Sequence, residues 1–497
     1  MRRLLYLLII LATVAQSSEA VAVQLVTNST NDETCQAAEI TDAQAVLQRA
    51  MEVTGLDAVP DQVLHLQAMD GVEMNYQSER TYPPFFSLMR KTEIWLDPQT
   101  GIQRTEATAV FPGNGPNPYP PIVNKAASAF MTRDTMMVPM PAGVGTPHQL
   151  HALGVLKNWR ADPEVRVAER CTYRDYWRTV LSRPGKEANE RLYFDPKTGF
   201  PVKLDTQERH YLWGQVHVEY QYSLWGKLGA MHVPRASFRV VDGATEITQT
   251  IGTMELIAQD EAPALRVPDP LPPVPDQPPM FLQAIPPDTV GVGTDTYLLV
   301  NRGYTEAVAL IDGTVYMFEA TQNEERARLD HEWVQKLFPG EHPIVVVVTD
   351  LAWPHIAGVR YWVAQGATIV SHSISEDFLR QVVERRWTLE PDLLEQRRDE
   401  VMFRFIGIDA LHKLADGKVQ LFPIDGIGSE GAIVAYLPEV DFLWASDFIQ
   451  RADEPTAYAT EVWQAVQRVG VAPEQTAAQH LPLTPWKTIE SLQTEDE

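Results

Sequence analysis

The chain has 497 residues, with 41 basic against 66 acidic side chains and a formal net charge of −25 at pH 7. This length is sufficient for two or three domains, each with a buried core. The acidic balance and the lack of a basic run exclude nucleic acid as the main partner, because phosphate binding depends on clustered lysine and arginine.

The first residues have the pattern of an export signal. Arg2 and Arg3 give the positive start, residues 4–14 the apolar stretch, and residues 18–20 a small-x-small cleavage site. The apolar stretch is shorter than the about 20 residues that span a bilayer, and no second stretch of membrane length follows. We therefore expect residues 1–20 to be a signal peptide and the mature protein to be periplasmic, without integral membrane association. An uncleaved anchor is the alternative.

Two cysteines, Cys35 and Cys171, are the only ones in the chain. Disulfides persist in exported proteins, so we expect these two to pair and to close a long loop. In the chain-entropy model such a loop stabilises the fold by about 4–5 kcal/mol before strain is subtracted. The alternative is two buried thiols that pack as small apolar side chains.

Residues 36–260 predict an N-terminal α+β domain rich in antiparallel strands. An amphipathic helix is expected over residues 42–54, with Asp42 as its N-cap. The segments IWLDPQTG (94–101) and LYFDPKTG (192–199) each end in Asp-Pro-x-Thr-Gly, which predicts two tight hairpins. A large, curved antiparallel sheet of this kind resembles, in architecture only, the sheets of periplasmic lipid- and lipoprotein-carrying proteins.

Aromatic residues are dense between residues 172 and 225. They could line a concave apolar site for a ligand, or they could fill the core of the sheet, which is the commoner use of such side chains. His148 and His151 are expected in a loop without acidic partners.

Proline is concentrated between residues 261 and 288, as in PDPLPPVPDQPP at 268–279. Proline fixes φ and removes a hydrogen-bond donor, so neither a helix nor a central strand can continue through this stretch. It predicts an extended linker before a second domain, residues 289–497.

The second domain carries several motifs in a fixed order. Residues 344–348 read as a short buried strand, and a helix is expected from Val359. The segments VVVVTDLAWPHIAG (345–358), YWVAQGATIVSH (361–372), PIDGIGSEGAIVAYLPEVDFLWASDF (423–448) and AAQHLPLTPWK (477–487) resemble motifs of the metallo-β-lactamase superfamily. The resemblance covers about residues 289–490. It implies an αββα sandwich, and therefore an α+β chain overall.

In that family, two zinc ions share a water or hydroxide that attacks a carbonyl or ester. The ligand positions of the first ion correspond here to Asp350, Ala352 and Gly428. Two of these have no coordinating side chain, so the resemblance implies that the first metal site is lost.

The second site is better preserved. Its ligand positions correspond to Pro354, His355, Asp447 and His480. Two histidines and one carboxylate form a recognised set for a single divalent ion. The resemblance therefore implies at most one zinc, manganese or iron ion, held by His355, Asp447 and His480, and no other cofactor.

Pro354 argues against hydrolytic activity, because proline fixes its own φ inside the metal-binding loop and disfavours a helical backbone at the preceding residue, Trp353. We expect Trp353 to point into the emptied site. The leading hypothesis is a pseudoenzyme, an exported binding or scaffold protein whose partner is an unknown small molecule or protein. One alternative is a mononuclear metallohydrolase acting on an ester, lactone or amide, with Asp350 as base. Another is a periplasmic carrier that holds an apolar ligand through its N-terminal sheet.

Overall fold

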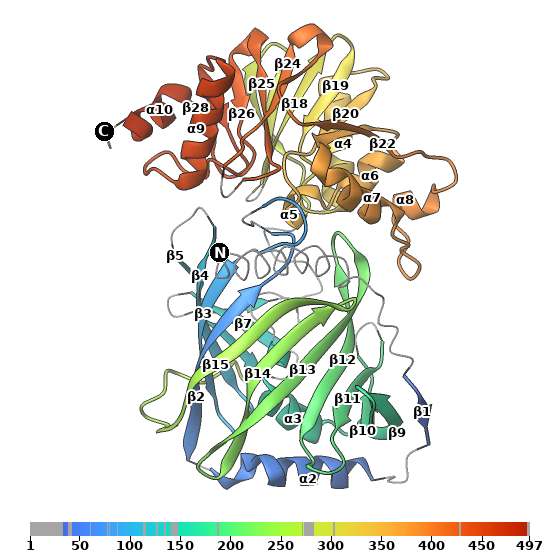
Figure 1. Cartoon of the computed structure of the whole chain (residues 1–497), viewed down its shortest axis with the longest axis vertical. Coiled ribbons are helices and arrows are strands. Elements are labelled where there is room, and N and C mark those ends of the chain that lie inside the picture. The colour runs from blue at the N-terminus through green and yellow to red at the C-terminus, as the bar shows by residue number, and fades with distance from the viewer. Residues whose placement is uncertain are drawn as a thin grey trace, which may run out of the picture.

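The computed structural model describes most of residues 33–494 (Figure 1). The residues left out within this span are 38–41, 60, 77, 79, 87, 113–115, 126–127, 134–135, 141–147, 186–187, 271, 273–282, 302–303 and 427–428. The expected signal peptide, Gly428 and much of the proline-rich linker therefore lie outside the described residues. In the described part of the chain, no helix has both the length and the apolar character needed to cross a membrane.

A single antiparallel sheet of 15 strands forms the N-terminal part, which we call the first domain. The strand order is β1-β9-β10-β11-β12-β13-β14-β15-β2-β3-β4-β6-β7-β8, and β5 pairs with β4. The strands are β1 (Cys35–Gln36), β2 (Gln62–Val72), β3 (Leu88–Leu96), β4 (Gln103–Val110), β5 (Pro116–Pro118), β6 (Ile122–Lys125), β7 (Ser128–Arg133), β8 (Met136–Met140), β9 (Arg166–Tyr173), β10 (Tyr176–Arg183), β11 (Glu190–Phe194), β12 (Pro201–His210), β13 (Gly214–Leu228), β14 (Met231–Val241) and β15 (Ala244–Ala258).

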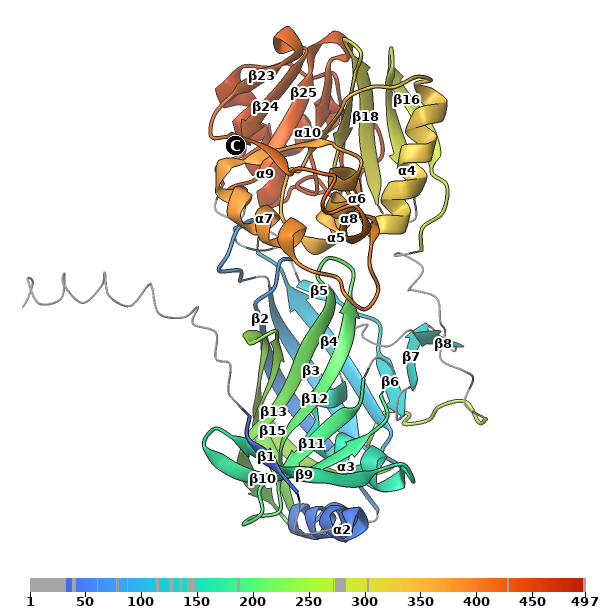
Figure 2. The same ribbon diagram turned by 90° about the vertical axis from the view of Figure 1, so that its right-hand side faces the viewer.

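The sheet curves around helix α3 (Ala152–Ala161), and α2 (Ala43–Thr54) crosses its lower end (Figures 1 and 2). Both helices share one apolar core with the concave face of the strands. The expected cap is confirmed, since the Asp42 side chain accepts from the N–H groups of Gln44 and Ala45.

Both expected hairpins are present, at the β3–β4 and β11–β12 connections. Asp97 Oδ1 accepts from the N–H of Gln99 at 2.8 Å, and Asp195 Oδ1 accepts from the N–H of Lys197 at 2.8 Å. Each turn ends on a glycine with positive φ, where a side chain would be strained. The expected disulfide is also confirmed, because Cys35 is bonded to Cys171.

The aromatic residues between 172 and 225 lie on both faces of this sheet. Tyr220 and Tyr222 belong to the core on the concave face. Tyr193 packs on the opposite face beside Cys171, where the Lys203 ammonium lies 4.2 Å from its ring. These side chains therefore support both faces of the sheet and do not line one common site.

Two smaller sheets form the C-terminal part, which we call the second domain. One has seven strands: β16 (Asp288–Gly293), β17 (Thr296–Val300), β18 (Thr305–Ile311), β19 (Thr314–Phe318), β20 (Ile344–Val347), β21 (Thr368–His372) and β22 (Arg404–Ile408). The other has six: β23 (His412–Leu414), β24 (Val419–Pro423), β25 (Ile433–Leu437), β26 (Phe442–Trp444), β27 (Gln475–Ala477) and β28 (Thr484–Pro485). The helices are α4 (Glu324–Leu337), α5 (Trp353–Ile356), α6 (Val359–Ala364), α7 (Glu376–Glu384), α8 (Leu393–Gln396), α9 (Ala457–Val469) and α10 (Trp486–Thr494).

Three apolar cores separate four layers in this domain. The middle core joins the two sheets, with Phe318 and Val347 on one side and Trp444 on the other. A second core lies between the seven-stranded sheet and helices α4, α6 and α7, and a third lies between the six-stranded sheet and α9 and α10. The order is helix, sheet, sheet, helix (Figure 1), which is the αββα arrangement that the resemblance implied.

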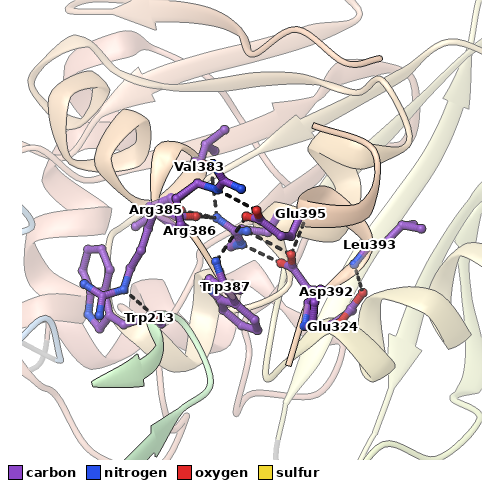
Figure 3. Close-up of polar contacts among 12 residues, drawn as sticks. Trp213, Glu324, Val383, Arg385, Arg386, Trp387, Asp392, Leu393 and Glu395 are labelled. Carbon is purple, nitrogen blue, oxygen red and sulfur yellow. Dashed lines mark hydrogen bonds and ion pairs between the residues drawn. The ribbon is translucent and has the colours of Figure 1, made fainter. Parts of the chain in front are cut away.

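The two domains meet through a turn of the first domain at residues 210–214, between β12 and β13. Arg385, just after α7, donates to the carbonyl oxygens of Trp213 and Gln215 and to Asp242 Oδ2, the last two at 2.9 and 2.7 Å. Figure 3 shows Arg385 reaching this turn while its neighbour Arg386 bonds Glu395 within the second domain. A second contact, made by residues 73–86, covers the candidate site.

Candidate functional site

All four side chains expected at the site, those of Asp350, His355, Asp447 and His480, lie close together in the second domain. His355 lies in the short helix α5, and Asp447 follows β26. His355 Nε2 is 3.8 Å from Asp447 Oδ2, and His480 Nε2 is 3.4 Å from Asp447 Oδ1. His355 and Asp447 are each 3% exposed, whereas the side chain of His480 is 35% exposed.

Asp350 holds the other nitrogen of His355. Its two carboxylate oxygens lie 2.8 and 2.9 Å from His355 Nδ1. The same carboxylate accepts from the N–H of Ala352 at 2.8 Å and from Ser446 Oγ at 3.3 Å. A carboxylate bound to one imidazole nitrogen fixes the ring and directs the other nitrogen outward. These contacts favour a positioning role for Asp350 over the role of base.

The charges around His355 change its proton affinity. Burial acts to lower the pKa of His355, but the adjacent Asp350, with smaller contributions from Asp447 and Glu319, raises it to about 9. Burial and the charge of Asp350 raise the pKa of Glu319 to about 8. The centre is therefore a cationic imidazole among carboxylates when no metal ion is bound.

Glu319, directly after β19, is a further buried acid at this centre. Trp444 Nε1 donates to Glu319 Oε1 at 3.0 Å, and Thr349 Oγ1 donates to the same oxygen. Its backbone has φ 91°, a left-handed value that is uncommon for a residue with a side chain. Its signal in the sequence is an acidic residue directly after the apolar run of residues 315–318.

The donor types at the centre fit a single divalent ion. Two imidazoles and one carboxylate suit zinc, manganese or iron. Among the described residues, two groups of three have ligand atoms that all lie within 4.8 Å of one another, and the set of His355, Asp447 and His480 is not one of them. Binding of an ion by all three side chains would thus require their ligand atoms to move closer together than they are in this structure. The position of Pro354 offers no ligand, and Ala352 offers only its backbone.

A cavity of ≈ 20 Å³ lies beside Asp350 and Asp447. The residues that line it are Tyr76, Ser78, Thr81 and Phe85 from the first domain, and Asp350, Ala352, Asp447, Phe448 and Tyr458 from the second. A volume of this size holds about one water molecule. The cavity is therefore too small for an ester, lactone or amide substrate in this arrangement.

The segment that closes the cavity is residues 73–86, which we call the β2–β3 loop. Its Asn75 exchanges two hydrogen bonds with the second domain. The N–H of Trp353 donates to the Asn75 carbonyl at 2.6 Å, and Asn75 Nδ2 donates to the Leu351 carbonyl at 3.1 Å. Farther along, the N–H of Thr81 donates to the Glu430 carbonyl at 2.9 Å. The loop is thus bonded to the second domain on two sides of the cavity.

The expected direction of Trp353 is wrong. Its ring stacks on Tyr211 at 5.9 Å between centroids and meets the edge of His210 at 5.5 Å, and it does not line the cavity. The first-domain turn provides an aromatic surface for this half-buried ring, so Trp353 packs between the domains. Tyr76, and not Trp353, lines the cavity.

Three tyrosines, one half-buried and two buried, lie near enough to Asp447 to feel its charge, and the sequence analysis missed them. They are Tyr76 of the β2–β3 loop, Tyr304 before β18 and Tyr458 in α9. Burial is the main cause of the raised pKa of each phenol, and the charge of Asp447 adds to it. All three therefore stay protonated at neutral pH. No local pattern marks them, since an isolated tyrosine is usually a core residue.

Comparison with protein-family models gives no match, and comparison with curated proteins gives none either. Solved structures similar to part of the chain are metallo-β-lactamases. The DIM-1 metallo-β-lactamase is 13% identical, covers 43% of this chain and 97% of its own, and has a TM-score of 0.34. The FIM-1 enzyme from Pseudomonas aeruginosa, in its mono-zinc form, is 15% identical, covers 42% of this chain and 95% of its own, and has a TM-score of 0.33. The metallo-β-lactamase from Pontibacter korlensis is 11% identical, covers 42% of this chain and 97% of its own, and has a TM-score of 0.33. No activity is transferred from these proteins, because likeness at this TM-score carries no functional argument.

Proposed function

We propose that the protein is a binding or scaffold protein in which the second domain is a metallo-β-lactamase-like domain with a dismantled dinuclear site. The observation that carries this proposal is the ≈ 20 Å³ cavity closed by the β2–β3 loop. A hydrolase needs a wet pocket that admits its substrate. Here, four residues of the first domain line the small cavity beside Asp350 and Asp447.

One metal ion remains compatible with this function. His355, Asp447 and His480 would hold the ion, and Asp350 would keep the ring of His355 in the orientation that presents Nε2. A bound divalent ion lowers the pKa of a coordinated water, which is the chemistry of the alternative, a mononuclear hydrolase acting on an ester, lactone or amide. Tyr76 lines the cavity beside Asp447, and Asn75 bonds the backbone of Leu351 and Trp353 next to Asp350.

Export is part of the proposal. The pattern of residues 1–20 supports it, and the Cys35–Cys171 disulfide suits an oxidising compartment such as the periplasm.

The test is elemental analysis of the purified protein beside the double variant His355→Ala/His480→Ala. A matched control carries His342→Ala and His412→Ala, which change two second-domain histidines outside the candidate site: His342 contacts the Gly313 carbonyl, and His412 lies on β23. The same three proteins are assayed with panels of esters, lactones and amides. We expect at most one ion per chain, lost only in the His355/His480 variant, and no turnover. Turnover that disappears with the ion would overturn the scaffold proposal and establish the hydrolase.

A further inference from the structure

A row of buried polar side chains crosses the concave face of the first domain. Asp70 on β2 lies opposite Gln249 on β15 and opposite Arg90 on β3. Asp70 and Gln249 are 0% exposed and Arg90 is 7% exposed. The neighbouring inward positions, Ala68 and Val72, belong to the apolar core. The row is therefore a polar stripe in apolar surroundings.

Asp70 uses its hydrogen-bonding capacity within the row. Its Oδ2 accepts from Arg90 Nε and from Thr92 Oγ1, each at 2.8 Å, and its Oδ1 accepts from Gln249 Nε2 at 2.9 Å. The carboxylate and the guanidinium balance in charge. The row is thus formally neutral, and its central acid needs no further partner.

Three other atoms at this place have no hydrogen-bond partner among the described residues. They are Arg90 Nη2, Gln249 Oε1 and Nε2 of His151, the residue before α3. Burial lowers the pKa of His151 to about 4, and the charges of Asp70 and Arg90 both act on it. His151 is therefore neutral and lies near the row. Buried polar atoms are almost always paired, so unpaired atoms gathered at one place indicate a missing partner.

We propose that this row is the binding site for the polar group of an amphiphilic ligand whose polar group is uncharged. The required chemistry follows from the three atoms. Arg90 Nη2 needs an acceptor, Gln249 Oε1 needs a donor, and a neutral imidazole nitrogen takes either role. A hydroxyl or a primary amide both donates and accepts, whereas a carboxylate only accepts and would bury a charge that nothing in the row balances. The inward positions on either side of Asp70, Ala68 and Val72, are apolar, so the non-polar part of such a ligand would meet apolar side chains.

The row also lies close to the end of the sheet that faces the second domain. β2 ends at Val72, two residues after Asp70, and the β2–β3 loop begins there. Tyr76 of that loop packs against the core of the first domain and lines the cavity beside Asp447. A ligand in the row would therefore lie beneath the loop that closes the candidate site.

The test is calorimetric titration of the whole protein with octanamide, 1-octanol and octanoate. Arg90→Lys keeps a cation for Asp70 but removes the second guanidinium nitrogen, and Gln249→Met removes the free acceptor. Thr92→Val is the matched control, because it also removes a donor to Asp70 but touches none of the three unpaired atoms. Thermal unfolding shows that each variant is folded.

We expect octanamide and octanol to bind the native protein and Thr92→Val equally, with at least tenfold weaker binding to Arg90→Lys and Gln249→Met. Octanoate should bind least. The proposal is overturned if folded native protein binds neither neutral probe, if octanoate binds more tightly than octanamide, or if Arg90→Lys binds like the native protein. Equal loss in Thr92→Val would also overturn it, because the row would then be structural.

Discussion

The imidazole of His355 is held by Asp350, whose carboxylate oxygens lie 2.8 and 2.9 Å from Nδ1. Of the two ring nitrogens, this leaves Nε2 to face Asp447. The pairing makes the orientation of His355, and with it any affinity for a metal ion, dependent on a residue that is not itself among the expected ligands.

We expect Asp350→Ala to weaken zinc binding about 10–100-fold, the usual effect of removing a partner that orients a metal-bound histidine. Competition with a chromophoric chelator measures this affinity. Asp453→Ala, which changes an exposed acid of the same domain, should leave the affinity unchanged. If Asp350 were instead a base, the variant would retain the native zinc affinity and lose only turnover.

Arg385→Ala should loosen the closure of the candidate site. The change removes the hydrogen bonds to Trp213, Gln215 and Asp242, which together hold the first-domain turn against α7. We expect the backbone amides of the β2–β3 loop and of Trp353 to exchange hydrogen faster in this variant. Mass spectrometry of the peptides measures the exchange. Arg386→Ala is the control, because Arg386 bonds Glu395, which lies in its own domain (Figure 3). Equal exchange in both variants would mean that Arg385 does not hold the junction.

Acid should weaken the protein through His210. Its Nδ1 accepts from the N–H groups of Leu212 and Trp213 at 3.1 and 3.3 Å. Burial, together with the charges of Arg239 and Arg385, lowers the pKa of His210 from 6.5 to about 3. The unfolded chain therefore binds a proton below pH 6.5 that the folded protein does not. This contribution to stability is complete above that pH and is lost as the pH falls towards 3.

The measurement is the melting temperature between neutral pH and about pH 4. His210→Gln keeps a side-chain acceptor but cannot be protonated, so its melting temperature should fall less steeply than that of the native protein. His217→Gln changes a histidine that is 47% exposed and should follow the native curve. Parallel curves for all three proteins would contradict the assignment.

Replacing both cysteines by serine should lower the free energy of unfolding of the first domain by about 2–4 kcal/mol. The Cys35–Cys171 bond closes a loop of sequence separation 136, so its loss frees the unfolded chain. Denaturant unfolding measures the change. Native protein treated with a reductant should match the double variant, and an unchanged midpoint in both would show that the bond contributes nothing.

Local signals in the sequence were sufficient where the neighbours along the chain determine the geometry. Asp42 caps a helix because its side chain reaches N–H groups two and three residues ahead. The two Asp-Pro-x-Thr-Gly turns close hairpins for the same reason. The motifs of the second domain also predicted that His355 and Asp447 lie close together, as the structure shows.

Contacts between the two domains could not be predicted from local patterns in the sequence. Trp353 turned toward Tyr211 because a turn more than one hundred residues earlier in the chain offers it an aromatic face. Tyr76 reaches the centre from the first domain, and no pattern around it indicates a neighbour so distant in sequence. His151 was expected without an acidic partner, yet the charge of Asp70 acts on it across the concave face.

The surface of the first domain that receives the second comes from three stretches far apart in the chain: the β2–β3 loop, the turn at 210–214 and the turn at Asp242 between β14 and β15. The 15-stranded sheet is what places them next to each other. Domains fold as units, and during synthesis the N-terminal one folds first. The docking surface can therefore be complete before the ribosome has finished the second domain, so the second domain emerges beside the surface that lines its cavity.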